Sequence, residues 1–200
     1  PQEFPLHSSI VQQWRAVRGL VTRTLEKMPD GEYGFRPTPE MRTFAGSAGH
    51  LISAAVNQCG NLTASRHALT GQPLETSLAT KAEVVSAWTA TAEFCDGYFN
   101  GLTTNAQLTD RFYETTVTRD GQRVAIKGAH GVIVSAFLAH LNEMYGYMAV
   151  YLRLKGLVPP SSERTPPPAA APPAVQTDAA AVIALAIEAQ GGEATLRGLH

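Results

Sequence analysis

One long apolar stretch, residues 129–156, constrains the fold of this chain more than any other feature. Its large side chains recur every three or four residues and therefore share one face of a helix; they are Ile133, Phe137, His140, Met144, Tyr147 or Met148, and Tyr151. Other helices must cover a stripe of this length. His140 lies at the centre of the stripe, and a buried imidazole needs a hydrogen-bonding or metal partner. The identity of that partner is central to the function.

Two further amphipathic helices are expected in the first third of the chain. Apolar residues at helical spacing predict a helix over about residues 8–28, with Ser8 and Ser9 as candidate N-caps. A second helix is expected over about residues 44–69, and Thr43 can cap it.

The third helix has the clearest start signal in the sequence. Thr80 and Glu83 have the spacing of a capping box, in which each side chain bonds the other residue's backbone N–H. The region 111–128 then breaks the helical pattern. Asp120-Gly121 lies between two β-prone runs and favours a short hairpin, although a loop over the mouth of the bundle fits equally well. These segments predict an all-α protein, an up-and-down four-helix bundle.

The composition excludes two classes of partner. With 44% hydrophobic and 16% charged residues and a net charge of −1, the chain has no basic stripe for nucleic acid. No apolar run reaches the roughly 18 residues that a membrane span requires. A small molecule or a protein remains as partner, and a homodimer is one of the assemblies left open.

Composition changes sharply after the fourth helix. Ser, Pro and Ala dominate the segment up to residue 177, which predicts a semi-rigid extended spacer. We therefore expect the bundle over residues 1–163, a linker over 164–177, and over 178–200 the start of a second domain that is incomplete.

Cys59 and Cys95 are the only cysteines, and they are too far apart for a Cys-x-x-Cys motif. Both fall on the apolar side of an expected helix. They are either two buried thiols or one disulfide that ties two helices, and a disulfide needs an oxidising compartment. With the spacer and a start that lacks Met, which fits signal removal or a trimmed chain, the cysteines favour an extracytoplasmic or periplasmic location.

Several motifs occur together in this chain: Tyr33-x-Phe35-Arg36-Pro37-Thr-Pro-Glu40-x-Arg42-Thr43-Phe44, then Gly49-His50-Leu51, then His140-x-Asn142-Glu143-x-Tyr145-Gly146, then Tyr151-Leu152-Arg153-Leu-Lys155-Gly156-x-Val158-Pro-Pro. Together they resemble the DinB-like (DinB/YfiT-type) family over about residues 8–163. The resemblance implies a four-helix bundle. Many members bind a divalent metal through one histidine on the second helix and a His-x-x-x-His pair on the fourth, and some are thiol-dependent transferases or isomerases.

The resemblance implies a metal site at His50 and His140, with Met144 at the third ligand position, where the family has histidine. A thioether is a soft ligand that suits Cu(I) far better than Zn, Ni or Mn. A catalytic divalent ion usually has three protein ligands and a water. A Zn, Ni or Mn ion is thus a possible cofactor, but Met144 argues against it. If the site holds no such ion, no cofactor is expected.

Other residues are candidates for the same pocket. Glu143 and Asn57 could complete a ligand set, although neither has the expected spacing, and Glu143 could instead act as a base for a bound water. Asn57 and Tyr147 are candidate pocket walls. His50 could equally lie on a solvated face, and His140 could be a core histidine bonded to His50, to a tyrosine or to a backbone carbonyl.

Two functions follow from these alternatives. The first is a non-catalytic bundle with a degenerate metal site, which binds a small molecule or a protein partner. The alternative is a divalent-metal-dependent hydrolase or transferase that uses His50 and His140 as ligands. The departure at Met144 favours the first.

Overall fold

The computed structural model describes residues 4–163 and residue 188. The chain divides into two units after Glu163, and the fold described below is that of the first unit. The linker expected over 164–177 lies outside the described residues, and so does the second domain expected from residue 178, apart from residue 188.

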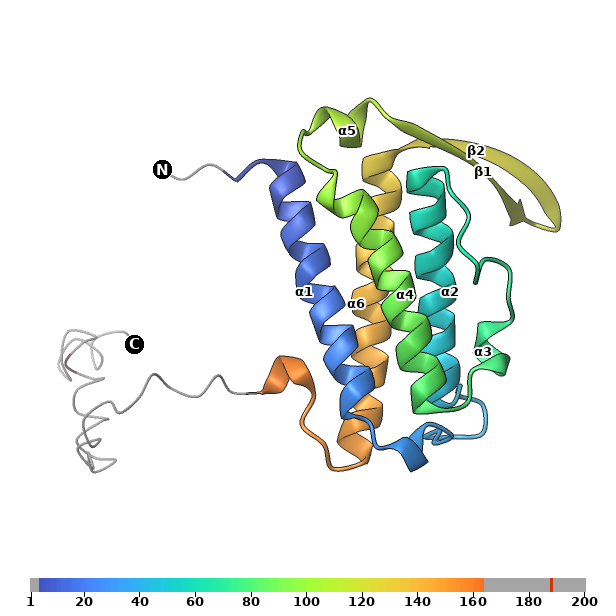
Figure 1. Ribbon diagram of the computed structural model, residues 1–200, viewed down its shortest axis with the longest axis vertical. Coiled ribbons are helices and arrows are strands. Elements are labelled where there is room, and N and C mark those ends of the chain that lie inside the picture. The colour runs from blue at the N-terminus through green and yellow to red at the C-terminus, as the bar shows by residue number, and fades with distance from the viewer. Residues whose placement is uncertain (1–3, 164–187, 189–200) are drawn as a thin grey trace, which may run out of the picture. The chain divides into compact units, whose positions relative to one another are not determined.

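Four long helices lie side by side and form the bundle (Figure 1). They are α1 (Leu6–Lys27), α2 (Phe44–Thr63), α4 (Lys81–Asn100) and α6 (His130–Leu154). Helices α1 and α2 each pack against both α4 and α6. The all-α four-helix bundle predicted from the apolar periodicity is confirmed.

Short elements connect the long helices. They are η1 (Asp30–Glu32), α3 (Leu74–Ser77), α5 (Ala106–Thr109) and η2 (Pro160–Ser162). Helix α3 is a single turn that packs against α2 (Figure 1). Leu74, which is 1% exposed, holds this turn in the core.

The core between the long helices is rich in aromatic side chains. Trp14 stacks on Phe99 with 4.7 Å between ring centroids, and Phe137 lies 5.9 Å from Trp14. Ring pairs of this kind add to the free energy gained by burying apolar surface. Most of the stripe of the fourth helix faces this core, with Phe137, Met144 and Tyr151 all buried. His140, expected at the centre of the buried stripe, is only partly buried, because it lies at the edge of the contact between α2 and α6.

A disulfide links two of the helices. Cys59 on α2 and Cys95 on α4 have an S–S distance of 1.98 Å and a Cα–Cα distance of 5.3 Å. Both residues are fully buried. Of the two alternatives that the sequence left open, the structure therefore has the bridge.

A two-stranded antiparallel hairpin precedes α6, at one end of the bundle (Figure 1). Strand β1 (Phe112–Arg119) pairs with β2 (Gln122–Ala129). The turn residues Asp120 and Gly121 have φ values of 49° and 76°, the left-handed conformation that a tight hairpin turn needs and that Asp and Gly tolerate. The hairpin predicted from Asp120-Gly121 is confirmed.

The predicted helix starts are partly correct. The Thr43 hydroxyl accepts the Gly46 N–H at 2.9 Å, and the capping box between Thr80 and Glu83 is present. The first helix is present as predicted, but the N-cap prediction was wrong, because α1 begins at Leu6 and therefore includes Ser8 and Ser9 within its first turn.

The second helix is shorter than predicted. Helix α2 ends at Thr63 instead of Leu69, because Ala64 adopts a left-handed conformation with φ 51°. Its N–H donates to the carbonyl of Gly60 and closes the helix.

None of the helices among the described residues combines the length and the apolar character that crossing a membrane would require.

Candidate functional site

His50 on α2 and His140 on α6 meet between the two helices. Their ring centroids are 5.3 Å apart, and the ring planes are inclined at 78°, an edge-to-face contact. Each side chain is 30% exposed, so the pair is neither a core contact nor a freely solvated one. The solvated-face alternative for His50 is therefore not what the structure has.

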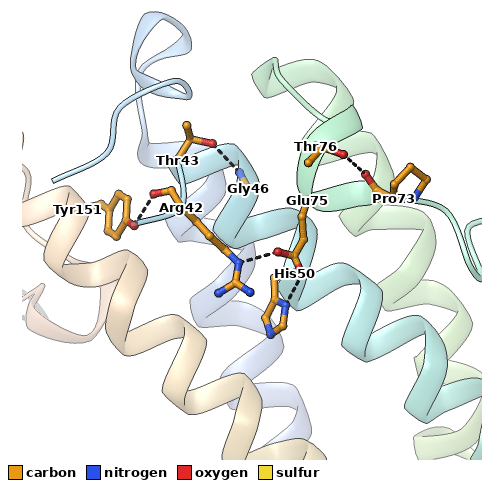
Figure 2. A network of polar contacts seen from close by, with 8 residues as sticks. All are labelled: Arg42, Thr43, Gly46, His50, Pro73, Glu75, Thr76 and Tyr151. Atoms are coloured by element: carbon orange, nitrogen blue, oxygen red, sulfur yellow. Dashed lines mark hydrogen bonds and ion pairs between the residues drawn. The ribbon is translucent and has the colours of Figure 1, made fainter. Parts of the chain in front are cut away.

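A glutamate that the sequence analysis did not identify holds His50. Nδ1 of His50 lies 2.6 Å from Oε1 of Glu75, and Nε of Arg42 lies 2.7 Å from Oε2 of the same carboxylate (Figure 2). Partial burial opposes ionisation of Glu75, but the hydrogen bonds from Arg42 and His50 outweigh it and lower the pKa of the carboxyl. Because an ionised carboxylate only accepts hydrogen bonds, Nδ1 of His50 must carry the proton.

The residues that hold His50 come from elements that are themselves fixed by contacts. Glu75 belongs to the single turn α3, which lies directly against the first half of α2 (Figure 2). Arg42 comes from the loop ahead of α2, and its carbonyl accepts a hydrogen bond from the Tyr151 hydroxyl of α6 at 2.7 Å. Three separate elements are thereby joined around His50.

A second glutamate holds His140. Nδ1 of His140 lies 3.0 Å from Oε2 of Glu143, and the hydroxyl of Tyr147 donates to Oε1 of Glu143 at 3.0 Å. The hydrogen bond from His140, and after it the one from Tyr147, lowers the pKa of the Glu143 carboxyl. The hydrogen bond between Tyr147 and Glu143 in turn raises the pKa of Tyr147. Glu143 is thus an ionised partner of His140, which leaves it poorly suited to act as a base for a bound water.

Both imidazoles therefore have the same arrangement. Each donates a hydrogen bond from Nδ1–H to its own glutamate, which directs the other ring nitrogen, Nε2, away from the carboxylate and towards a possible ligand. Among the described residues, no hydrogen bond involves Nε2 of His50 or of His140. The pair can accept protons or hydrogen bonds from a ligand, and it could contribute two nitrogen ligands to a metal.

A cavity of about 560 Å³ opens about one helical turn from this pair, next to Ser47 of α2 and Met144 of α6; the two histidines are not themselves among its lining residues. Side chains of the loop ahead of α2 and of helices α2 and α6 line it: Glu40, Met41, Arg42, Ser47, Met144, Tyr147 and Tyr151. Arg42 belongs both to the cavity wall and to the network around His50. Tyr147, a predicted pocket residue, and Met144, predicted at the third ligand position, are both part of this wall.

The structure does not support the pocket role predicted for Asn57. Asn57 is exposed and lines a separate hollow of about 340 Å³ with Gly60, Asn61 and Thr115 of the hairpin. It does follow His50 by two helical turns, but those turns carry it about 10 Å along α2, away from the histidine pair.

The donor set does not fit a divalent metal of the Zn, Ni or Mn type. Such an ion usually has three protein ligands from His, Cys, Asp or Glu. Over residues 4–163 and at 188, no three side chains of these types are grouped so that they could hold a metal. Glu75 and Glu143 are engaged with the Nδ1 atoms, and the position one turn after His140 carries the thioether of Met144.

The fourth helix carries another histidine, with a different partner. Nδ1 of His130, at the start of α6, lies 3.3 Å from the hydroxyl of Tyr98. Both residues are buried, and this pair is separate from the one formed by His50 and His140.

Two comparisons with known proteins identify the relatives of the fold. A DinB-like protein from Bacillus cereus, known from its crystal structure, superposes with a TM-score of 0.57 at 16% sequence identity, over 76% of this chain and 93% of that one. A likeness at this identity concerns the fold. A comparison with curated protein sequences gives no match. The sequence also matches the DinB superfamily over residues 13–130, more than half of its length. This chain therefore belongs to the DinB superfamily.

Proposed function

We propose that this protein is a binding module of the DinB superfamily, which takes a small organic molecule in the cavity near His50 and His140 and works without a Zn, Ni or Mn ion. The observation that carries the proposal is the arrangement of the two imidazoles. Each is oriented by its own glutamate and leaves one ring nitrogen for a ligand, while a third side chain able to complete a divalent site is lacking among the described residues.

The cavity lining suggests the kind of ligand. Met144 and Tyr151 are buried and provide an apolar wall, and Met41 and Tyr147 are partly exposed at its rim. Arg42 uses only Nε on Glu75, and its terminal nitrogens make no hydrogen bond within the described part of the chain. A planar guanidinium with free N–H groups suits a carboxylate or a phosphate. The ligand class is therefore a small molecule with an apolar body and one anionic group.

A binding experiment tests this proposal. Aromatic carboxylates and their neutral amides are compared by ligand-observed NMR against the full chain in metal-free buffer. The carboxylates are expected to bind more tightly than the amides, and Ser47→Leu, which fills the cavity from α2, should abolish binding. Asn57→Leu, in the separate hollow, is the matched control and should leave binding unchanged. Equal binding of amides and carboxylates, or binding that Ser47→Leu leaves intact, would contradict the proposal.

A second candidate function is a divalent-metal-dependent hydrolase or transferase that uses His50 and His140. One observation favours it, because metal-ligating histidines commonly donate their other ring N–H to a carboxylate, as both rings do here. Met144 and the engagement of Glu143 argue against it. A metal would supply Lewis-acid chemistry, and the test is whether the native protein retains one zinc ion per chain that is lost in His140→Ala.

The disulfide supports an extracytoplasmic location as part of the same proposal. Buried disulfides persist in oxidising compartments and are rare in the reducing cytosol. Mass spectrometry of alkylated native protein, without reductant, is expected to give the bridged mass. Two alkylated thiols in protein taken from its own cell would contradict the location.

A further inference from the structure

The outer face of α6 is unusually apolar for the surface of a bundle. Tyr147, Val150 and Leu154 are 50%, 51% and 56% exposed. They recur at three- and four-residue spacing with Gly146 and therefore form one continuous face. A surface helix normally turns charged side chains outward. From Asn142 to Leu154, α6 has only two charged residues, Glu143 and Arg153.

Gly146 provides an opening in this face. It is exposed, and a Cβ built on it would meet nothing within 4 Å. Because the neighbouring Val150 is large and exposed, the face has a projection and a recess one helical turn apart. A side chain of another helix can fill this recess.

Two opposite charges flank this apolar face. Glu143 and Arg153 have opposite signs and are ten residues apart, one on each side of Gly146 and Val150. In an antiparallel pair of α6 helices related by a two-fold axis near residue 148, residue 143 opposes residue 153, and residue 146 opposes residue 150. A parallel pair would instead place like charges together, which costs free energy.

We propose that this chain forms a two-fold homodimer through the outer face of α6, with the two helices antiparallel. Glu143 of each copy pairs with Arg153 of the partner subunit, and Val150 of each copy fills the recess at Gly146 of the other. The interface is continuous with the histidine site, because Glu143 also holds His140. The dimer therefore places a cation beside each site. This inference goes beyond ligand binding and does not depend on it.

A pair of single helices buries a modest area, so the dimer is expected to be concentration-dependent. Sedimentation equilibrium of the full chain, from about 10 μM to about 1 mM, covers the range for such a contact. The expected result is a monomer–dimer equilibrium within this range. A protein that remains monomeric at every concentration would overturn the proposal, and the face would then be left to another partner.

Substitutions within α6 locate the interface. Val150→Glu is expected to weaken dimerisation at least about tenfold, because it buries an unpaired charge. Val132→Glu is the matched control on the same helix, at 59% exposure, and it lies beyond the overlap of the two helices. It should leave the dimer unchanged. An equal effect of the two substitutions would contradict the placement.

A charge exchange tests the antiparallel pairing. Glu143→Arg alone and Arg153→Glu alone should each weaken the dimer, because each places like charges opposite one another. The double variant restores opposite charges and should recover most of the association. A double variant as weak as the sum of the single variants would refute the pairing. Far-UV circular dichroism checks that each variant keeps the helical fold.

Discussion

The carbonyl oxygen of Leu74 lies so close to Gly49 that a Cβ on residue 49 would be 2.3 Å from it. This close approach holds the single turn α3 against α2, and α3 carries Glu75. The glutamate that orients His50 therefore owes its position to the missing side chain of Gly49.

Gly49→Ala is expected to destabilise the protein, although alanine favours helix. The added methyl must displace the backbone of α3, and overpacking of this kind costs about 1–3 kcal/mol. Urea unfolding measures the loss. Gly97→Ala on α4 is the control, because a Cβ there would meet nothing within 4 Å. It should stabilise the protein by up to about 1 kcal/mol, and equal effects of the two changes would contradict this role of Gly49.

The disulfide is expected to contribute substantially to stability. Cys59 and Cys95 are 36 residues apart, and closing a loop of this length in the unfolded chain is worth about 4 kcal/mol on the chain-entropy model. Urea unfolding with and without reductant should show a lower midpoint for the reduced protein. Because both sulfurs are buried, native protein should be reduced only at the rate at which it unfolds. Rapid reduction without unfolding would contradict this burial.

Glu75 is expected to contribute to stability near neutral pH, and this contribution should be lost in acid. Its pKa is lower in the folded protein than the usual value of 4.5, so the folded state binds fewer protons there than the unfolded state. The contribution is complete above about pH 4.5 and disappears as the pH falls through the lowered pKa. Glu75→Gln should lack this dependence, whereas Glu93→Gln, an exposed glutamate on α4, should retain it. Parallel acid dependences of wild type and Glu75→Gln would refute the role of Glu75.

His130 is expected to make stability depend on pH in a second, higher range. Burial, and to a lesser extent Arg111, lowers the pKa of His130 below 6.5, so the folded protein favours the neutral ring. Its contribution is complete above about pH 6.5 and is lost as the pH falls from there through the lowered pKa. Thermal unfolding of His130→Gln should show a weaker dependence on pH in this range than wild type. His7→Gln, at the surface, should behave as wild type does.

The sequence predicted the bundle well because long apolar periods determine it. Residues 133–151 fix one buried face of α6, and the signals at Thr80 and at Asp120-Gly121 depend on local backbone chemistry that tertiary structure did not override. The end of α2 was missed because Ala64 adopts a left-handed conformation, for which alanine has no sequence signature.

The site was predicted only in part. His50 and His140 could be named from the resemblance, but Glu75 lies in a four-residue helix that is too short to have any periodicity. The apolar residue Leu74, directly before Glu75, was a local sign that this turn packs on the bundle, and the structure shows it buried. The pocket role predicted for Asn57 failed because two helical turns return a side chain to the same face but also separate it from His50 along the helix axis.

Zinc binding by wild type and by Met144→His tests the central claim most directly. Both proteins are dialysed against the same zinc buffer, and bound metal is measured by inductively coupled plasma mass spectrometry. The account predicts that wild type retains far less than one zinc per chain. Met144→His, which supplies a third imidazole one turn from His140, should retain close to one. Stoichiometric zinc in wild type that is lost in His140→Ala would contradict the account and favour the metal-dependent enzyme.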